Sequence, residues 1–453
     1  MGSIIELIGN TPIVKLSKID TGISELYLKL ENQNPGGSIK DRIGLSMITD
    51  AEKKGYINKD STLIEATAGN TGLGIALVAS LKGYKLILVI PDKMSQEKVI
   101  HLRAMGAKII MTRSDVGKGH PEYYQDLAEK IHKETPNSFY INQFNNPANP
   151  LAHETTTGPE IFQQMNGDID ALVCGVGSSG TITGLSRYFS KMKPDMEMIL
   201  ADPKGSILAD YINHKTIGEA GSWVVEGIGE DFIPPIADFS FTKKAYTITD
   251  EESLSTAREL LSKEGILGGS SSGTLVAAAL KYCRESKTKK RVVTFICDSG
   301  NKYLSKVYND YWMIDQGFLK RDSFGDLRDL ISRRHIKGET VFLKPDDTLL
   351  TAFSRMKLYD ISQLPVLEDG ENIVGILDEY DILLHTSKDK LNFQKQVKEF
   401  MTYSLTMLSP ATPERELLQV FDSGKVAIVV DKGRFLGLIT KIDYINFLRR
   451  KNA

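Results

Sequence analysis

The chain has 453 residues, of which 41% are hydrophobic and 25% charged, a balance typical of a globular protein with two or three domains. Its formal net charge is −2, so no excess of basic residues points to a nucleic acid or an anionic membrane as a partner. The three cysteines are too scattered for a disulfide framework or a cysteine-based zinc site. We see no signal peptide and no apolar run long enough to span a membrane, and therefore expect a cytoplasmic protein.

The residues up to about 317 predict a layered α/β domain. Short apolar runs alternate here with longer helical patterns, such as those at 70–82 and 251–263, and Thr249 or Asp250 is expected to cap the second of these helices. Nearly continuous apolar runs are typical of a mostly parallel sheet with helices on both faces. The predicted buried strands are residues 86–90, 108–111, 171–174, 198–201 and 292–296.

One lysine and three glycine-rich turns of this domain carry groups suited to chemistry. Lys40 follows a glycine turn in the segment 34–42, and an enclosed lysine can lose its proton and become a nucleophile. The other turns, at 65–74, 176–184 and 264–273, combine small residues and hydroxyls with predicted helix starts, where backbone N–H groups bind anions. Each feature alone is also explained by a surface lysine or a tight turn. Together they describe a site for a phosphate and a lysine-bound ring, which is what pyridoxal phosphate needs.

The residue composition of the sequence changes after residue 318. A charged segment at 318–335 is interpreted as a linker with some helix. Beyond it, the sequence VGILDEYD at 374–381 recurs as LGLITKID at 436–443, each time after a strand pattern and a turn. We predict a domain over 1–317, followed by two packed β-α-β-β-α units over 336–395 and 396–453.

The segments 34–42, 67–72, 177–181 and 226–229, in this order, resemble the β-family (fold type II) of pyridoxal-phosphate enzymes. The repeat resembles a Bateman module, a pair of domains that bind adenosyl ligands. A β-family domain followed by such a module is the architecture of the cystathionine β-synthases, and the tail at 298–313 is also more similar to them than to cysteine synthases. The resemblance implies an α/β catalytic domain with open, mostly parallel sheets, and a tandem β-α-β-β-α module after it.

The resemblance also implies roles for individual residues. Lys40 would carry the cofactor as an internal aldimine and move the Cα proton of the substrate, while Asn70 would bind the 3′-oxygen of the cofactor ring and Ser271 its nitrogen. The residues expected to hold the phosphate are Gly177, Ser178, Ser179, Gly180 and Thr181. The residues expected to bind the substrate are Thr67, Ala68, Gly69, Thr71, Gln143, Gly227 and Glu230. No metal ion is expected, because the histidines show no ligand spacing.

The implied reaction is a β-replacement. L-serine or an activated serine would condense with homocysteine to cystathionine through an aminoacrylate, and cysteine could serve as a source of hydrogen sulfide. The second interpretation is a cysteine synthase that uses O-acetylserine and sulfide and carries a fused regulatory module. An interpretation of a different class is a non-catalytic sensor of adenosyl ligands on an enzyme scaffold, and the intact Lys40 and Asn70 favour the enzyme. The resemblance further implies a homodimer or higher homo-oligomer with small amino-acid and thiol substrates.

Two departures from the family pattern concern the substrate site. Ala68 stands where the family often has serine, and Glu230 where well-studied cystathionine synthases have tyrosine. A carboxylate at the mouth would prefer a substrate with a free amino group. Animal members carry a haem-binding segment before the catalytic domain, and because this chain begins at that domain we expect no haem.

The two repeats differ at their expected ligand residues. Thr440 and Asp443 keep the pattern in which threonine binds a phosphate or hydroxyl and aspartate binds ribose. In the first repeat Asp381 is kept, but Asp378 replaces the threonine and would repel a phosphate. We expect one working site, for S-adenosylmethionine or a nucleotide; the alternative is a module that only dimerises.

Overall fold

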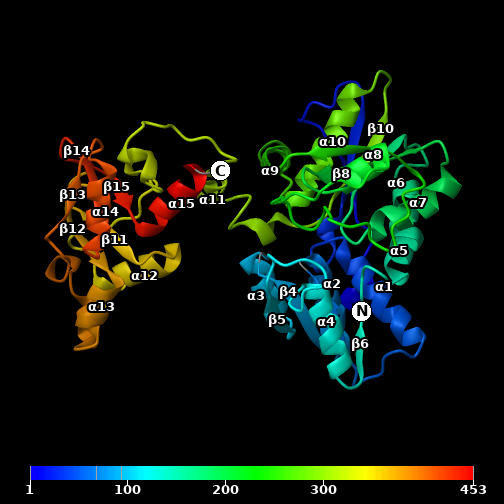
Figure 1. The fold of residues 1–453 in the computed structure, drawn as a ribbon, viewed down its shortest axis with the longest axis horizontal. Coiled ribbons are helices and arrows are strands. Elements are labelled where there is room, and N and C mark those ends of the chain that lie inside the picture. Colours follow the sequence, from blue (N-terminus) through cyan, green and yellow to red (C-terminus); the bar gives the residue numbers. More distant parts are fainter. Residues whose placement is uncertain (1, 68, 93, 452–453) are drawn as a thin grey trace. The chain divides into compact units, whose positions relative to one another are not determined.

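The computed structural model describes residues 2–67, 69–92 and 94–451 (Figure 1). The chain divides into two compact units, Met1–Asp310 and Tyr311–Ala453. Each unit has hydrophobic cores of its own, and each is therefore described by itself.

The larger sheet of the first unit has six strands in the order β1-β2-β10-β7-β8-β9. The short β1 pairs antiparallel with β2 and all other neighbours are parallel. The strands are β1 (Ile13–Lys15), β2 (Glu25–Leu30), β7 (Ala171–Gly175), β8 (Glu197–Pro203), β9 (Thr242–Ile248) and β10 (Arg291–Ile296). The predicted strands at 171–174, 198–201 and 292–296 are confirmed, because their apolar runs are buried from both faces of the sheet.

The smaller sheet of the first unit has four parallel strands in the order β5-β4-β3-β6. They are β3 (Thr62–Ala66), β4 (Lys85–Pro91), β5 (Lys108–Thr112) and β6 (Ser138–Tyr140). The predicted strands at 86–90 and 108–111 are confirmed, and the two parallel sheets confirm the α/β fold class.

Helices surround both sheets (Figure 1). They are α1 (Lys40–Lys53), α2 (Asn70–Lys82), α3 (Gln96–Ala104), α4 (Tyr124–Glu134), α5 (Ala148–Ala152), α6 (Gly158–Gln164), α7 (Gly180–Met192), α8 (Leu208–His214), α9 (Asp250–Glu259) and α10 (Ser270–Glu285). The predicted helix over 70–82 is confirmed. Thr249 caps α9 through a capping box with Glu252, and the helix predicted to reach residue 263 continues past Glu259 as a π-helical turn over Leu260–Glu264.

The second unit contains the expected repeat. Each copy has a helix, two antiparallel strands and a second helix. The elements of the two copies are α12 (Leu349–Tyr359), β11 (Gln363–Leu367), β12 (Ile373–Asp378), α13 (Glu379–Thr386), β13 (Met407–Leu408), α14 (Glu414–Asp422), β14 (Ala427–Asp431), β15 (Arg434–Ile439) and α15 (Lys441–Lys451), and the short helix α11 (Asp310–Asp315) precedes both copies. In the second copy a short strand, β13, precedes the helix and pairs parallel with β14. In the first copy a single parallel bridge between Leu343 and Val366 stands in the equivalent place.

The segment interpreted as a linker takes part in this core. Leu327, Leu330 and Ile331 are buried against Leu417 and Phe421 of the second repeat. Their spacing is that of one helical face, which the surrounding charges hide in the sequence. Within the described ranges, no helix is long and apolar enough to cross a membrane.

Candidate active site

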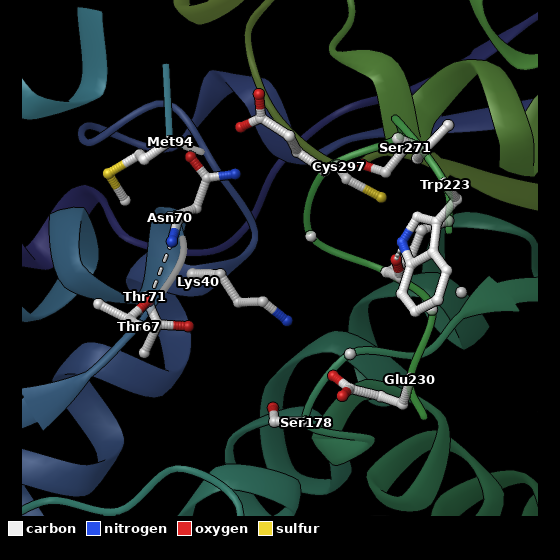
Figure 2. Close-up of a pocket in the computed structure, with 18 of the residues that line it drawn as sticks. Lys40, Thr67, Asn70, Thr71, Met94, Ser178, Trp223, Glu230, Ser271 and Cys297 are labelled. Atoms are coloured by element: carbon white, nitrogen blue, oxygen red, sulfur yellow. Dashed lines mark hydrogen bonds between the residues drawn. The ribbon is translucent and has the colours of Figure 1, made fainter. Parts of the chain in front are cut away.

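A pocket of about 410 Å³ opens in the first unit beside the carboxyl ends of parallel strands from both sheets (Figure 2). Ligand sites of open α/β sheets occur at such ends. The pocket brings together most of the residues that the sequence singled out. Those that line it are Lys40, Thr67, Gly69, Asn70, Thr71, Gln143, Gly177, Ser178, Thr181, Gly227, Glu230 and Ser271. Ser179 and Gly180 lie in the same turn as Ser178, and Ala68 lies outside the described residues.

Lys40 is the first residue of α1, and its side chain extends into the pocket (Figure 2). Burial lowers the pKa of Lys40 from its ordinary value, although Cys297, Asp298 and Glu230 act in the opposite direction. A lowered pKa increases the fraction of neutral amine, the form that attacks a carbonyl or accepts a proton. The glycine turn before the helix needs Gly37, whose φ of 74° is in the left-handed region.

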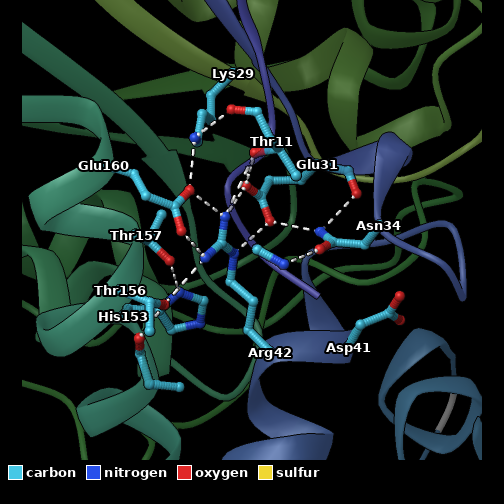
Figure 3. A network of polar contacts seen from close by, with 12 residues as sticks. Thr11, Lys29, Glu31, Asn34, Asp41, Arg42, His153, Thr156, Thr157 and Glu160 are labelled. Carbon is cyan, nitrogen blue, oxygen red and sulfur yellow. Dashed lines mark hydrogen bonds and ion pairs between the residues drawn. The ribbon is translucent and has the colours of Figure 1, made fainter. Parts of the chain in front are cut away.

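A buried ionic network supports this turn from behind (Figure 3). The Arg42 guanidinium donates to both carboxylate oxygens of Glu31 at 2.8 Å and to both of Glu160 at 2.7 Å. Asn34 donates to the same Glu31 carboxylate at 2.8 Å, and Lys29 donates to Glu160 at 2.7 Å. Because Asn34 and Arg42 lie on either side of the turn, the network fixes both of its ends.

The turn after β7 has the features of a phosphate site. Ser179 adopts a left-handed conformation, with φ of 64°, just before the 13-residue helix α7. Its hydroxyl is buried and has no hydrogen-bond partner among the residues that the structure describes. A Cβ on Gly177 would lie 2.7 Å from the carbonyl oxygen of Gly227, so only glycine fits there. An unpartnered hydroxyl beside a helix N-terminus matches the needs of a phosphate group.

Ser271 lies at the start of α10, on the pocket wall next to Cys297. The hydroxyls of the two flanking serines are engaged elsewhere: Ser270 accepts from the backbone N–H of Glu226 at 3.1 Å, and Ser272 from that of Cys297 at 3.0 Å. Of these three serines, Ser271 is the one that lines the pocket. Its hydroxyl is therefore the group of this cluster that can meet a ring nitrogen.

The loop after β3 forms the opposite wall. Thr71 donates to the Gln143 side chain at 2.7 Å, and Thr67 accepts from the backbone N–H of Gly69 at 3.1 Å. This loop leads into the 13-residue helix α2, whose N-terminus favours an anion such as a substrate carboxylate. Beneath it lies Glu65, and burial raises the pKa of its carboxyl to about 8.

A second polar cluster borders the pocket, and the predicted site contained none of its residues apart from Asn70. Asn70 donates from its amide nitrogen to Asp298 at 2.7 Å and accepts from Lys302 at 3.0 Å. Asp298 also accepts from Tyr303 at 2.6 Å, and Lys98 donates to Tyr303 at 3.0 Å. The signal in the sequence was the polar segment 298–303 immediately after a buried strand, at the edge where ligands bind.

In the second unit, the predicted ligand residues cap helices. Asp443 accepts from the backbone N–H of Thr440 at 2.7 Å and from its hydroxyl at 2.5 Å, and Ser332 donates to the same carboxylate group. In the first repeat, Asp378 and Asp381 form a capping box at the start of α13. The two pairs thus occupy equivalent places in the two repeats.

Each of the two units matches a known family model. The model described as pyridoxal-phosphate dependent enzyme matches residues 4–298, and the model described as CBS domain matches residues 327–387 and 397–450. These ranges account for the pocket of the first unit and for both repeats of the second.

Known proteins are similar to nearly the whole chain or to about two thirds of it. A Dictyostelium discoideum protein named cystathionine beta-synthase is 36% identical, over 99% of this chain and 93% of its own. The structure of an O-acetylserine dependent cystathionine beta-synthase from Helicobacter pylori matches with a TM-score of 0.63 and 38% identity, covering 68% of this chain and 99% of that one. A hydrogen sulfide-producing enzyme from Fusobacterium nucleatum matches with a TM-score of 0.63 and 39% identity, covering 67% and 100%. The chain belongs to the pyridoxal-phosphate-dependent enzymes and, with its C-terminal pair of CBS domains, to the cystathionine β-synthase group among them.

Proposed function

We propose that this enzyme joins an L-serine-derived donor to homocysteine and releases cystathionine. The observation that carries the proposal is the enclosed Lys40 amine, which lies in one pocket with the turn after β7 and the loop after β3. The nearly full-length similarity to a protein named cystathionine beta-synthase supports the choice of acceptor. The solved relatives support O-acetylserine as a donor beside serine and hydrogen sulfide as a further product.

The pocket fits pyridoxal phosphate. When bound, this cofactor supplies an electron sink that lets a proton leave Cα and a substituent leave Cβ of an amino acid. Ser179 and the start of α7 would hold its phosphate, Ser271 would meet the ring nitrogen, and Asn70 would donate to the ring oxygen. A serine hydroxyl carries no negative charge with which to keep the ring nitrogen protonated, which favours loss of a Cβ substituent over transamination.

The residues of the pocket bind the substrate and transfer its Cα proton. Thr67, Thr71 and Gln143 bind the substrate carboxylate at the start of α2. The Lys40 amine accepts the Cα proton and later returns it to Cα. Between these steps the Cβ–O bond breaks and the thiol sulfur bonds to Cβ. The thiol proton leaves with the departing oxygen, as water from serine or as acetic acid from O-acetylserine.

Glu230 is proposed to select the acceptor. Its side chain lies on the pocket wall opposite the substrate loop (Figure 2). A carboxylate attracts the ammonium group of homocysteine and offers nothing to sulfide. Glu230→Gln, which keeps the size of the side chain, should lower kcat/KM for homocysteine about tenfold and leave kcat/KM for sulfide within about twofold. Equal losses for both acceptors would remove Glu230 from this role.

The second unit is proposed to bind an adenosyl ligand, such as S-adenosylmethionine, in its second repeat. Thr440 and Asp443 would exchange their mutual hydrogen bonds for contacts to the ligand ribose and its neighbouring hydroxyls. The first repeat lacks the threonine hydroxyl and has the carboxylate of Asp378 instead. One ligand per chain is therefore expected.

Product analysis tests the proposal. The purified protein, loaded with pyridoxal phosphate, is given L-serine or O-acetylserine with homocysteine or sulfide, and the products are identified by mass spectrometry. We expect cystathionine from homocysteine with at least one donor, and no product from the Lys40→Ala variant. Cysteine from O-acetylserine and sulfide, without cystathionine from either donor, would make the enzyme a cysteine synthase and overturn the proposal.

A further inference from the structure

The Asn70 amide lies between a buried cation and a buried anion. Lys302 is 7% exposed and donates to the amide oxygen, whereas Asp298 is fully buried and accepts from the amide nitrogen. The two charged groups thus contact opposite ends of one amide. An ammonium group can only donate and an ionised carboxylate can only accept.

These two contacts determine which way the amide points. If the amide were reversed, its NH2 group would face the Lys302 ammonium and its oxygen would face the Asp298 carboxylate. Both hydrogen bonds would be lost and both new contacts would be repulsive. Asn70 therefore keeps its nitrogen toward Asp298. An amide nitrogen has two hydrogens, so beside the bond to Asp298 a second N–H is available to the neighbouring Tyr303 hydroxyl and to a ligand in the pocket that Asn70 lines.

Lys302 also connects this amide to the turn that precedes Lys40. Its ammonium donates to the carbonyl oxygens of Gly36 at 3.0 Å and Gly37 at 3.1 Å in addition to Asn70. Three acceptors match the three N–H bonds of an ammonium group. The position of Lys302 is thus fixed by the same turn that fixes Lys40.

We propose that Lys302 and Asp298 are positioning residues that hold the Asn70 amide with one N–H toward the ring oxygen of pyridoxal phosphate. The aligned charges also polarise the amide, so the remaining N–H is a stronger donor than that of an isolated asparagine. The inference rests on the proposed function, because it assumes that this pocket binds the cofactor.

A double-mutant cycle tests this role. Lys302→Met removes the charge and all three donors while keeping a long side chain, and Asn70→Ala removes the amide. The affinity of each apoprotein for pyridoxal phosphate is measured by quenching of tryptophan fluorescence, since Trp223 lines the pocket. The absorbance maximum of each loaded protein is recorded as well. Neither readout depends on turnover.

We expect Lys302→Met to weaken cofactor binding about tenfold and to shift the absorbance maximum. In the Asn70→Ala background, the same substitution should change both values by less than about twofold. Equal effects in both backgrounds, or no effect of Lys302→Met on wild type, would overturn the inference. If Lys302→Met does not fold, Lys302→Gln, which has two N–H donors but no charge, replaces it under the same criteria.

The wild-type protein separates the two proposals. If it binds pyridoxal phosphate and makes cystathionine while the cycle shows no coupling, only the positioning role is wrong. If it does not bind the cofactor, the proposed function falls and the positioning role with it. Asp298→Asn provides an independent check, because it removes the anion and should shift the absorbance maximum only when Asn70 is present.

Discussion

Replacing Arg42 by methionine should destabilise the first unit by about 3–5 kcal/mol. Arg42 is 3% exposed, and its guanidinium bonds to two carboxylates, those of Glu31 and Glu160 (Figure 3). Glu160 would keep its pairing with Lys29 at 2.7 Å, so most of the cost comes from Glu31, which is fully buried and forms an ion pair with no second cation among the described residues. A buried carboxylate without its cation is what makes breaking such a pair costly.

The measurement is denaturant unfolding followed by tryptophan fluorescence in a Trp312→Phe background. The chain has two tryptophans, and with Trp312 removed the signal reports on Trp223 and thus on the first unit alone. Adding Glu31→Gln to Arg42→Met should recover roughly half of the loss, because it removes the unpaired charge.

The control is Lys54→Met, which removes an exposed ion pair with Asp50 and should cost about 1 kcal/mol or less. A loss below about 1 kcal/mol for Arg42→Met, or no recovery on adding Glu31→Gln, would show that the buried pair of Arg42 with Glu31 does not stabilise the first unit.

Three further predictions concern packing, pH and regulation. A Cβ on Gly74 would lie 2.5 Å from the carbonyl oxygen of Lys40, so Gly74→Ala should displace α1, lower stability by about 1–3 kcal/mol and lower kcat. The control is Gly117→Ala, which should be neutral because a Cβ there meets open space. Wild-type turnover of the Gly74→Ala variant would contradict this prediction. The pKa of Glu65 is raised to about 8, so the folded state binds this proton more tightly than the unfolded state, and stability should fall as pH rises from about 4.5 to about 8. Glu65→Gln should remove that fall when unfolding free energies at pH 5 and pH 8.5 are compared, and an unchanged slope would show that Glu65 is not its source. Thr440→Val should weaken S-adenosylmethionine binding about tenfold in calorimetry, and equal affinities would exclude Thr440 from the site.

Much of the fold could be predicted because burial leaves a local pattern. The strands at 86–90 and 171–174 are covered on both faces and appear in the sequence as nearly unbroken apolar runs. The helix at 70–82 is confirmed by α2, and Thr249 carries the expected cap. These features depend on neighbours within a few residues along the chain.

The parts that were missed depend on partners far away in sequence. Leu327 and Ile331 lie in a charged segment, and only the contacts with Leu417 in the folded second repeat show them to be core residues. The helix predicted over 251–263 has the expected extent, and only the π-helical form of its last turn, Leu260–Glu264, could not be predicted from the apolar pattern.

The candidate site shows the same division. Residues in glycine-rich turns, such as Lys40 and Ser271, could be predicted because each turn has a local signature and the order of the turns resembles a known family. Lys302 could not, because its three acceptors come from segments more than 200 residues away and a buried polar contact leaves no periodic pattern. Buried cations of this kind are found only when the fold brings their partners together.

The pocket around Lys40 is expected to bind pyridoxal phosphate through that lysine. Borohydride reduction of the loaded protein makes the bond between cofactor and lysine permanent, and peptide mapping by mass spectrometry then locates it. We expect a single modified peptide containing Lys40, and none after Lys40→Ala. Modification of Lys98 or Lys302 instead, the other buried lysines near the pocket, would contradict it.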